Sequence, residues 1–311
     1  MIQPAYLITE VDEAILQAFA RFHYLTAAQA SRLLYPNLAD DNRYMQRRLK
    51  KLVDTDYVLR LRALPVPQYG QAPHVFTLAR RGRQYLQEMG IGIPTYFRPS
   101  EEKRVTQNHP FMTHRLATID VLIAAAGLCR DQAVMSPRML SERELKHGAL
   151  QVAVPPGPHS ITQETRKVTV IPDAWFQLSV RNTAPVSIAI ELDRATEEQK
   201  VWRQKVAAYA YWANGPYQEA FETDNLTIAT VCPTNTRVRV LADWTTRELR
   251  ARGLEELADL FLFTAASPVT CTPAQFFYDP LWRTAIDVSP ISLLDTPTHP
   301  QHESEVVFQT A

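Results

Sequence analysis

The stretch that decides the fold is VSIAIELD, residues 186–193. Side chains alternate between the two faces of a β-strand. The aliphatic residues of this stretch therefore fall on one face, and the other face holds Ser187, Ala189, Glu191 and Asp193. Two carboxylates thus share a face at the end of a strand that otherwise suits a buried sheet. They must be solvated, paired with cations or bound to a metal, because burying a bare carboxylate is costly.

A helix predicted from Glu197 to Trp212 follows this strand, and Thr196 with Gln199 fits a capping box at its start. Lys205 lies within that helix. Its neighbours three and four residues away are Val201, Trp202, Ala208 and Tyr209. We expect a lysine centred on such an apolar stripe to point at the sheet, where an anionic site would explain it. The alternative is a lysine whose stem packs on apolar surface while its amine reaches water.

Another acid, Asp173, follows Pro172 at the start of a strand predicted to run to Val180. A lone Pro-Asp pair is common in turns, but its combination with a strand-end acid and an inward lysine is more specific. Two ligands of one Mg²⁺ lie within about 4–5 Å of each other, because each Mg–O bond is about 2.1 Å. We therefore predict that Asp173, Glu191 and Asp193 converge at one edge of a mixed sheet, with the amine of Lys205 directed at them.

Positive charge is concentrated in the first third of a chain whose formal net charge is zero. Residues 1–104 hold 15 Lys+Arg and 10 Asp+Glu, a net of +5, and the remainder holds 18 and 23, a net of −5. Between Arg21 and Arg83 the count is 12 basic to 4 acidic residues. A basic unit of this kind indicates nucleic-acid binding, and its alternative is a solvated basic face.

The basic N-terminal segment predicts three helices, a β-hairpin and a closing helix. The helices cover residues 11–21, residues 27–34 with Thr26 as N-cap, and a third stretch from Asp40 or Asp41 to about Asp54. The hairpin strands are 57–64 and 74–78, and the closing helix is 80–89. On the third helix the apolar residues form one stripe. The opposite stripe holds Arg43, Gln46, Arg47 and Lys50, with Lys51 next to them.

The remainder of the chain predicts a mixed α/β unit. After a linker at 91–106, the expected helices are 111–130, 197–212 and 238–252. The expected strands lie within 133–154 and at 167–171, 173–180, 186–193, 226–232 and 260–264. We predict an α/β chain of the α+β kind in three parts: a DNA-binding domain at 1–98, an α/β domain at 105–265 and a C-terminal extension at 266–311, partly flexible and Pro- and Thr-rich from about Ser289.

Several other classes of protein are disfavoured. Three widely spaced cysteines form neither a disulfide framework nor a CxxC zinc site. No apolar run approaches the roughly 20 residues of a membrane span and no secretory leader is expected, so we predict a cytoplasmic protein without a membrane partner. The sequence contains no GxxxxGK[ST] motif, so a P-loop ATPase is disfavoured. His109 and His114 do not share a helix face, so we expect packing and hydrogen bonding from them rather than metal binding.

Residues 10–90 resemble the winged helix-turn-helix family, through the runs RRLKKLV at 47–53 and LARRGRQYL at 78–86. In that family the third helix enters the major groove of DNA and the hairpin touches the backbone. The resemblance implies contacts with double-stranded DNA from Arg43, Gln46, Arg47, Lys50 and Lys51. The alternative is a winged helix used for protein contact.

Nearly the whole chain resembles the replication-relaxation family of plasmids and integrative elements. Its second part resembles the restriction-endonuclease-like, Pro-Asp/acid-x-Lys nuclease superfamily. The runs that carry the resemblance are NHP at 108–110, HRL at 114–116, SERE at 141–144, PDAWF at 172–176 and ELDRATE at 191–197. The resemblance implies that Asp173 and Glu191, with Glu142 or Asp193, hold Mg²⁺. Asp193 takes the position of the usual lysine, and Lys205 would replace that lysine from the neighbouring helix.

These observations predict a DNA-binding protein of a plasmid or integrative element, acting in its replication, relaxation or maintenance, with a nuclease-like domain that bears a Mg²⁺-dependent phosphodiesterase site. The alternative hypothesis is a non-catalytic transcriptional regulator whose degenerate nuclease-like domain dimerises or binds a partner. What separates the two is whether Lys205 reaches Asp173 and Glu191. A homodimer and a protein partner encoded by the same element fit either hypothesis.

Overall fold

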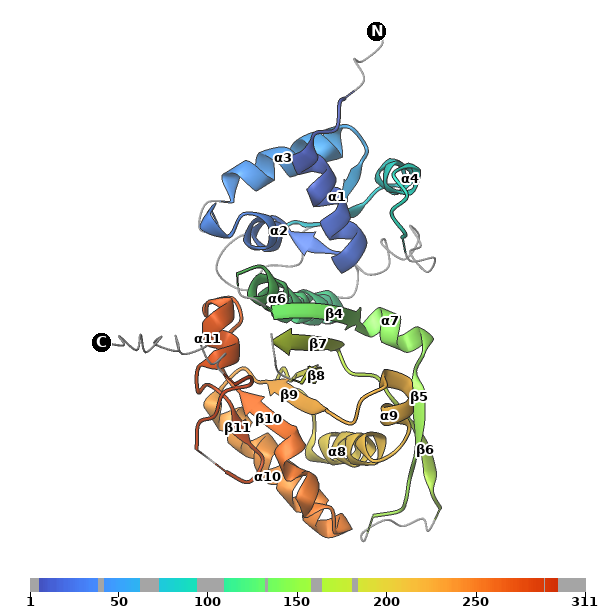
Figure 1. Ribbon diagram of the computed structural model, residues 1–311, viewed down its shortest axis with the longest axis vertical. Coiled ribbons are helices and arrows are strands. Elements are labelled where there is room, and N and C mark those ends of the chain that lie inside the picture. Colours follow the sequence, from blue (N-terminus) through green and yellow to red (C-terminus); the bar gives the residue numbers. More distant parts are fainter. Residues whose placement is uncertain are drawn as a thin grey trace, which may run out of the picture.

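The computed structural model describes residues 6–38, 42–61, 73–93, 109–131, 134–157, 164–180, 184–287 and 289–295. Two units lie one above the other along the long axis of the molecule (Figure 1). The N-terminal unit contains the elements α1 to α4, and the sheet unit contains the elements from α6 to β11. The predicted hairpin tip, most of the predicted linker and the acids Asp40 and Asp41 lie outside the described residues.

Helices dominate the N-terminal unit, and a small sheet closes it. Its elements are α1 (Glu10–Phe22), β1 (Leu25–Thr26), α2 (Ala27–Leu34), η1 (Pro36–Leu38), α3 (Arg43–Asp54), β2 (Val58–Arg60), β3 (Val75–Leu78) and α4 (Arg80–Glu88). The strands form an antiparallel sheet in the order β1-β3-β2. The predicted cap Thr26 is confirmed, because its hydroxyl accepts from Gln29 N in a capping box. Helix α3 begins after Asn42, whose side chain makes no cap hydrogen bond.

The sheet unit begins with a long helix and adds strands and helices to a six-stranded mixed sheet. Its elements are α6 (His109–Asp131), β4 (Val134–Ser141), α7 (Glu142–His147), β5 (Leu150–Val154), β6 (Arg166–Val170), β7 (Ala174–Val180), β8 (Val186–Leu192), α8 (Gln199–Ala213), α9 (Pro216–Phe221), β9 (Thr227–Val231), α10 (Asn235–Arg252), η2 (Glu255–Leu260), β10 (Phe261–Thr264), α11 (Pro273–Tyr278) and β11 (Arg283–Thr284). The predicted α+β class is confirmed.

Strand order in this sheet is β11-β10-β9-β8-β7-β4. Strand β7 pairs antiparallel with both β4 and β8, whereas β8, β9 and β10 are parallel to one another. The hairpin of β5 and β6 forms a separate two-stranded sheet that packs against α8. Strand β8 therefore lies inside the sheet, which explains the high aliphatic content of residues 186–193.

The two faces of β8 carry the two halves of its alternating pattern, as predicted. Ile188 and Ile190 belong to the core beneath α6, and that core continues into the N-terminal unit. Ala189 belongs to a second core on the other face, under α8 and α10. Because Glu191 follows the same alternation, its side chain points toward α8 rather than toward α6.

The connection from β8 to α8 differs from the prediction. Helix α8 begins at Gln199 with Glu198 at the N-cap, so the capping box expected from Thr196 is wrong. The carboxylate of Asp193 accepts from Ala195 N at 3.0 Å, and Ala195 has a φ of 58°. The side chain of Arg237 also donates to Glu197 O at 2.8 Å. These bonds hold the connection in a loop, which delays the start of the helix.

The segment after residue 265 joins the core instead of extending from it. Strand β11 pairs antiparallel with β10 at one edge of the sheet. The side chains of Phe276, Phe277 and Trp282 are fully buried, and Trp282 Nε1 donates to Phe276 O at 2.9 Å. The Pro- and Thr-rich tail is predicted to begin at about Ser289, and its residues 296–311 lie outside the described residues.

Helix α6 lies between the two units. Its length and composition differ from the expectation that no segment is apolar enough to span a membrane. Within the described part of the chain, Phe111–Asp131 is long and apolar enough to do so by length and composition. Most of this segment is buried against the N-terminal unit and the sheet. The core helix of a soluble protein passes the same test, so burial accounts for its apolar character.

Candidate functional site

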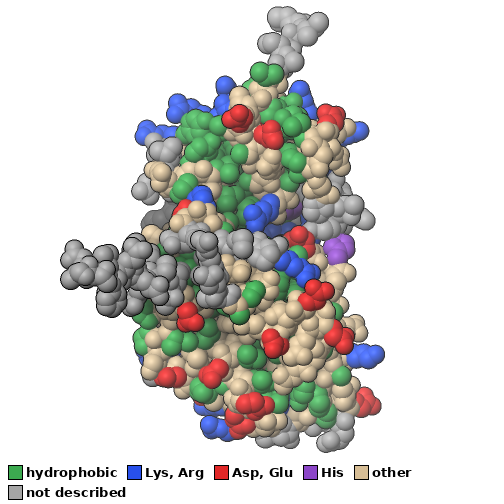
Figure 2. Space-filling model, viewed as in Figure 1, with side chains coloured by type: hydrophobic (Ala, Val, Ile, Leu, Met, Phe, Trp, Pro, Cys, Tyr) green, Lys and Arg blue, Asp and Glu red, His purple; other side chains and the backbone are tan. Residues whose placement is uncertain are grey.

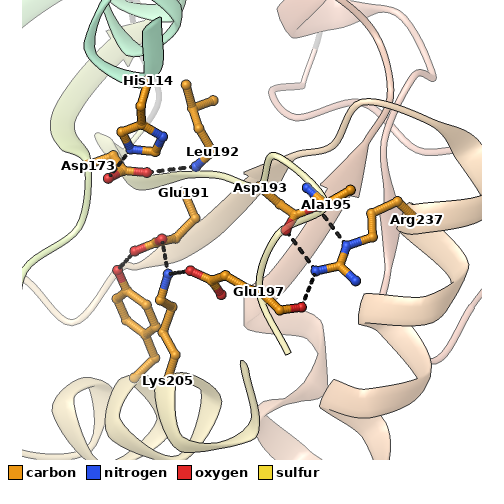
Figure 3. A network of polar contacts seen from close by, with 10 residues as sticks. His114, Asp173, Glu191, Leu192, Asp193, Ala195, Glu197, Lys205 and Arg237 are labelled. Atoms are coloured by element: carbon orange, nitrogen blue, oxygen red, sulfur yellow. Dashed lines mark hydrogen bonds and ion pairs between the residues drawn. The ribbon is translucent and has the colours of Figure 1, made fainter. Parts of the chain in front are cut away.

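The sheet brings Asp173 and Glu191 together at the end of β8. Strand β7 pairs antiparallel with β8, so the residue that precedes β7 lies beside the last residues of β8. The backbone N–H of Asp173 donates to Ile190 O at 3.0 Å, and its carboxylate accepts from Leu192 N at 2.8 Å. Figure 3 shows the carboxylate of Asp173 directed at His114 and that of Glu191 directed at Lys205. The two acids are therefore neighbours along the backbone, but their side chains have different partners.

His114 from α6 completes the surroundings of Asp173. Its Nε2 lies 2.8 Å from Asp173 Oδ1, and this interaction raises the pKa of His114 above its ordinary value. The sequence predicts hydrogen bonding for His114 but not this partner. The only feature of the sequence that could have indicated this partner is the place of His114 near the start of an apolar helix. The side chain of His109 lies outside the described residues.

Lys205 reaches Glu191, as predicted. Its Nζ lies 2.8 Å from Glu191 Oε2 and 2.6 Å from Glu197 Oε1. The hydroxyl of Tyr209, one turn further along α8, also donates to Glu191. The side chain of Lys205 is 29% exposed, so it is half-buried and not fully enclosed. Two carboxylates therefore share one ammonium group, and the described contacts of Lys205 do not include Asp173.

Burial and charge shift the pKa values of this group in definite directions. Burial raises the pKa of Glu191 to about 7; Lys205 opposes that shift, and the charge of Asp173 adds to it. Burial disfavours the charged form of Lys205, but Glu191 and Glu197 outweigh it and hold the pKa of Lys205 above its ordinary value. Burial also raises the pKa of Tyr209 well above 10, so its hydroxyl stays a donor.

Asp193 does not join this group, which corrects the predicted three-acid cluster. Its carboxylate pairs with the guanidinium of Arg237 from α10 at 2.8 and 2.9 Å, and its side chain is fully buried. Strand β8 ends at Leu192, so the alternation that would place Asp193 beside Glu191 stops one residue too early. No spacing in the sequence identifies Arg237, because α10 reaches the end of β8 through tertiary packing: the parallel pairing of β8 with β9 and the contact of α10 with α8.

Glu142 is close along the backbone but its side chain is engaged elsewhere. Its N–H donates to Asp173 O at 3.0 Å. Its carboxylate lies 2.5 Å from Lys146 Nζ and 3.7 Å from Arg115 Nη2. Glu142 and Asp173 therefore meet through their backbones, and among the described residues no group of three or more His, Cys, Asp or Glu side chains is placed to hold a metal ion.

The carboxylate oxygens of Asp173 and Glu191 already have hydrogen-bond donors in this arrangement. Both oxygens of Asp173 are used, by His114 and Leu192 N, and both oxygens of Glu191 are used, by Lys205 and Tyr209. Mg²⁺ needs oxygen ligands in near-octahedral geometry. Each oxygen keeps a second lone pair, so the main obstacle to a cation at Glu191 is repulsion by the ammonium group of Lys205, 2.8 Å from Glu191 Oε2.

A cavity of about 660 Å³ opens between β6 and α8 and reaches this group. Glu191, Lys205 and Tyr209 lie among its lining residues, and much of its remaining wall is aliphatic. The cavity therefore ends at the buried Glu191, on the α8 side of the sheet.

A second candidate surface lies on α3 at the far end of the molecule. Met45, Leu49 and Leu52 are buried in the N-terminal unit, as the predicted stripe requires. The opposite side of the helix is exposed, and one shallow hollow on it is lined by Arg43, Gln46, Arg47 and Lys50. Basic side chains stand out along this end of the molecule in Figure 2. Lys51 is exposed next to the hollow.

The other basic residue of α3 has a structural position. Arg48 Nη2 lies 2.6 Å from Asp12 Oδ1 and donates to the hydroxyl of Thr9 at 2.6 Å. Asp12 is fully buried and completes the capping box of α1. Arg48 therefore ties α3 to the start of α1 and does not belong to the exposed cationic face.

Comparison with known proteins gives one match. The family model described as replication-relaxation matches residues 16–226, which span both units. No curated protein and no solved structure matches the chain. Because the matched region covers more than half of the sequence and includes both the α3 face and the Asp173–Glu191 group, the chain belongs to the replication-relaxation family.

Proposed function

We propose that this protein binds double-stranded DNA through α3 and acts in the replication or relaxation of a plasmid or other mobile element. Its family supports the role in element replication or relaxation. The observation that carries the DNA contact is the exposed face of α3, where Arg43, Gln46, Arg47 and Lys50 surround one shallow hollow. Cations and an amide on a solvent-facing stripe suit a polyanionic partner better than a protein partner with an apolar surface.

The chemistry of these side chains suggests how α3 contacts DNA. A helix with its side chains is about 10–12 Å wide, which matches the roughly 12 Å major groove. Arg and Gln can each make two hydrogen bonds to the edge of one base, whereas Lys more often contacts phosphate. Lys50 lies 2.6 Å from Asp54 in an exposed pair, so phosphate can replace that carboxylate at little cost.

The first test measures binding of the full chain to duplex DNA by fluorescence anisotropy at several salt concentrations. Arg47→Ala should weaken specific binding by about 1–3 kcal/mol if it contacts a base edge. Arg239→Ala removes the same charge from an exposed position on α10 and should leave affinity unchanged. Equal affinity of wild type and Arg47→Ala, or binding that does not weaken as salt rises, would contradict the proposal.

DNA cleavage with Mg²⁺ is a second candidate function, favoured by the contact between Lys205 and Glu191 beside Asp173. The hydrogen bonds that occupy these carboxylates weigh against it. We propose testing supercoiled, linear and single-stranded DNA with Mg²⁺ and Mn²⁺, using Lys205→Ala and Asp173→Asn as inactive controls that keep the α3 face. If wild type cleaves none of these substrates, the group is a structural ion-pair network and the protein acts through DNA binding alone.

A further inference from the structure

The cavity that ends at Glu191 is large enough to hold a small molecule, and the proposed DNA contact gives it no role. Its volume of about 660 Å³ lies within the range of about 300–1,000 Å³ that is typical of small-molecule sites. Residues of the β5–β6 hairpin, α8 and α10 line it, whereas α3 belongs to the N-terminal unit beyond α6 (Figure 1). The site therefore has to be explained by its own lining.

One part of this lining is aliphatic and extends along the hairpin. Val154, Val168 and Val170 come from β5 and β6, and Ala207 and Ala208 come from α8. Both alanines are buried, and their short side chains leave the space between α8 and β6 unfilled. A ligand with an aliphatic body would fill this space and remove apolar surface from water.

The two ends of the cavity lie at the two ends of strand β6. Because β5 pairs antiparallel with β6, Pro155, which follows β5, lies at the end where β6 begins. Arg252 Nη1 donates to Pro155 O at 2.9 Å, so this arginine is at the same end. The other end of β6 leads to Asp173 beside Glu191. At about 3.3 Å per residue, the strand separates the two ends by roughly 15 Å.

Two guanidinium groups share one carboxylate at the Pro155 end. Arg203 Nε lies 2.6 Å from Glu248 Oε2, and Arg252 Nε lies 2.5 Å from Glu248 Oε1. The side chain of Glu248 is 7% exposed and that of Arg203 is 29% exposed. Within the described part of the chain, the two terminal nitrogens of Arg203 have no hydrogen-bond acceptor. This end therefore combines an excess of positive charge with donors that a ligand can use.

The Glu191 end has no such excess. Lys205 is shared there by Glu191 and Glu197, and Tyr209 donates to Glu191. An acidic group on a ligand would be repelled by these carboxylates and attracted by the arginines about 15 Å away. The lining thus predicts a polar ligand: an acidic head group at Arg203 and an aliphatic body that lies along β6 toward Glu191.

We propose that this cavity binds an amphipathic carboxylate, a molecule with one acidic head group and an unbranched aliphatic body. The terminal nitrogens of Arg203 would donate charge-assisted hydrogen bonds to the head group, as guanidinium groups do with carboxylates. The body would lie between β6 and the alanines of α8. This ligand site is additional to the α3 face and does not rest on the DNA-binding proposal.

The first experiment titrates the full chain with decanoate in a calorimeter, below the concentration at which the ligand forms micelles. Decanol has the same body without the acid, and acetate has the acid without the body. We expect decanoate to saturate one site per chain. Decanol should bind at least about tenfold more weakly, because hydrogen bonds from a charged group are lost. Acetate should show no saturable binding over the same concentrations.

The second experiment locates the decanoate site with three variants. Arg203→Gln removes the charge at the head group, and Val168→Phe fills the space of the body from a half-buried position on β6. Arg247→Gln is the control, because it removes an exposed arginine of α10 that does not line the cavity. Arg203→Gln and Val168→Phe should each weaken decanoate binding at least about tenfold, and Arg247→Gln should match wild type.

Thermal unfolding confirms that each variant is folded and provides an independent measure of binding. Decanoate should raise the Tm of wild type and of Arg247→Gln but not that of Val168→Phe. Equal binding of decanol and decanoate would overturn the acidic head group. The site itself is overturned if decanoate fails to saturate one site, if Val168→Phe and Arg203→Gln bind it like wild type, or if Arg247→Gln weakens binding as much as they do.

Discussion

Among single residues, Glu191 has the most consequential surroundings. Its carboxyl group is buried beneath α8 and contacts both Lys205 and Tyr209. Removing one partner of a buried ion pair lowers the free energy of unfolding by more than the intact pair contributes, because the remaining charge is left buried and unpaired. Lys205 is therefore needed for stability whatever its role in chemistry. The same contacts explain how one lysine on an apolar stripe is tolerated: Glu191 and Glu197 both neutralise it.

The titration of Glu191 predicts a pH dependence of stability. Its pKa is about 7 in the folded protein against 4.5 for the free group, so the folded state binds this proton more tightly. The resulting contribution to stability is fully present below about pH 4.5, is lost as pH rises to about 7 and stays absent above that.

Denaturant unfolding of Glu191→Gln across this range checks the prediction. The free energy of unfolding of wild type minus that of Glu191→Gln should fall between pH 4.5 and pH 7, by a few kcal/mol at most because one pKa unit is about 1.4 kcal/mol. Glu219→Gln, on the exposed side of α9, should leave the slope in place. A difference that stays constant between pH 4.5 and pH 7 would show that Glu191 is ionised throughout this range, against the prediction.

At the scale of elements, α4 packs unusually close to the segment that precedes β2. A Cβ atom added at Gly82 would lie 2.2 Å from Tyr57 O and 3.2 Å from Leu78 Cδ2. The same carbonyl accepts from Ala79 N at 3.0 Å, so it cannot move away freely. Gly82 is therefore required by packing, since its own backbone conformation does not demand glycine.

Gly82→Ala should push α4 off the small sheet and destabilise the N-terminal unit. Overpacking of this kind typically costs about 1–3 kcal/mol. Gly92→Ala is the matched control, because a Cβ there meets nothing within 4 Å. Urea unfolding of both variants compares the two costs, and equal midpoints for Gly82→Ala and wild type would show that α4 yields without strain.

For the whole molecule, α6 joins the two units into one structure. Its inward face contributes to the core that runs from Ile15 in α1 to Leu294 near the end of the described chain. Its other side meets α2, where Gln29 Nε2 donates to Leu116 O at 2.8 Å and to Asp120 Oδ1 at 2.9 Å. Arg32 also pairs with Asp120. The two units therefore share both apolar and buried polar contacts.

The C-terminal segment is predicted to be essential for folding of the sheet unit. Truncation after residue 265 would remove β11 and the fully buried side chains of Phe276, Phe277 and Trp282. Large aromatic side chains each contribute several kcal/mol, so this chain should fail to unfold cooperatively in calorimetry. Truncation after residue 295 keeps every described core residue and serves as control. A cooperative transition in the shorter chain would contradict the prediction.

The sequence by itself determined the features that depend on local periodicity. Alternation along residues 186–193 places Ile188 and Ile190 on one face and Glu191 on the other, because neighbouring side chains of a strand must point to opposite sides. Helical spacing separates the buried and exposed stripes of α3 and directs Lys205 toward the sheet. These features follow from a few consecutive residues, so no knowledge of distant segments is needed.

Only the tertiary structure decided which charged groups meet. His114 binds Asp173 across 59 residues of sequence, and Arg237 binds Asp193 across 44. Asp193 looks equivalent to Glu191 in the sequence, yet the end of β8 at Leu192 turns it toward α10. Pairing of this kind is set by strand order and helix packing, which place side chains from distant segments within hydrogen-bond distance. Local periodicity carries no information about contacts between distant residues. The ion-pair partners of the site could therefore be identified only from the tertiary structure.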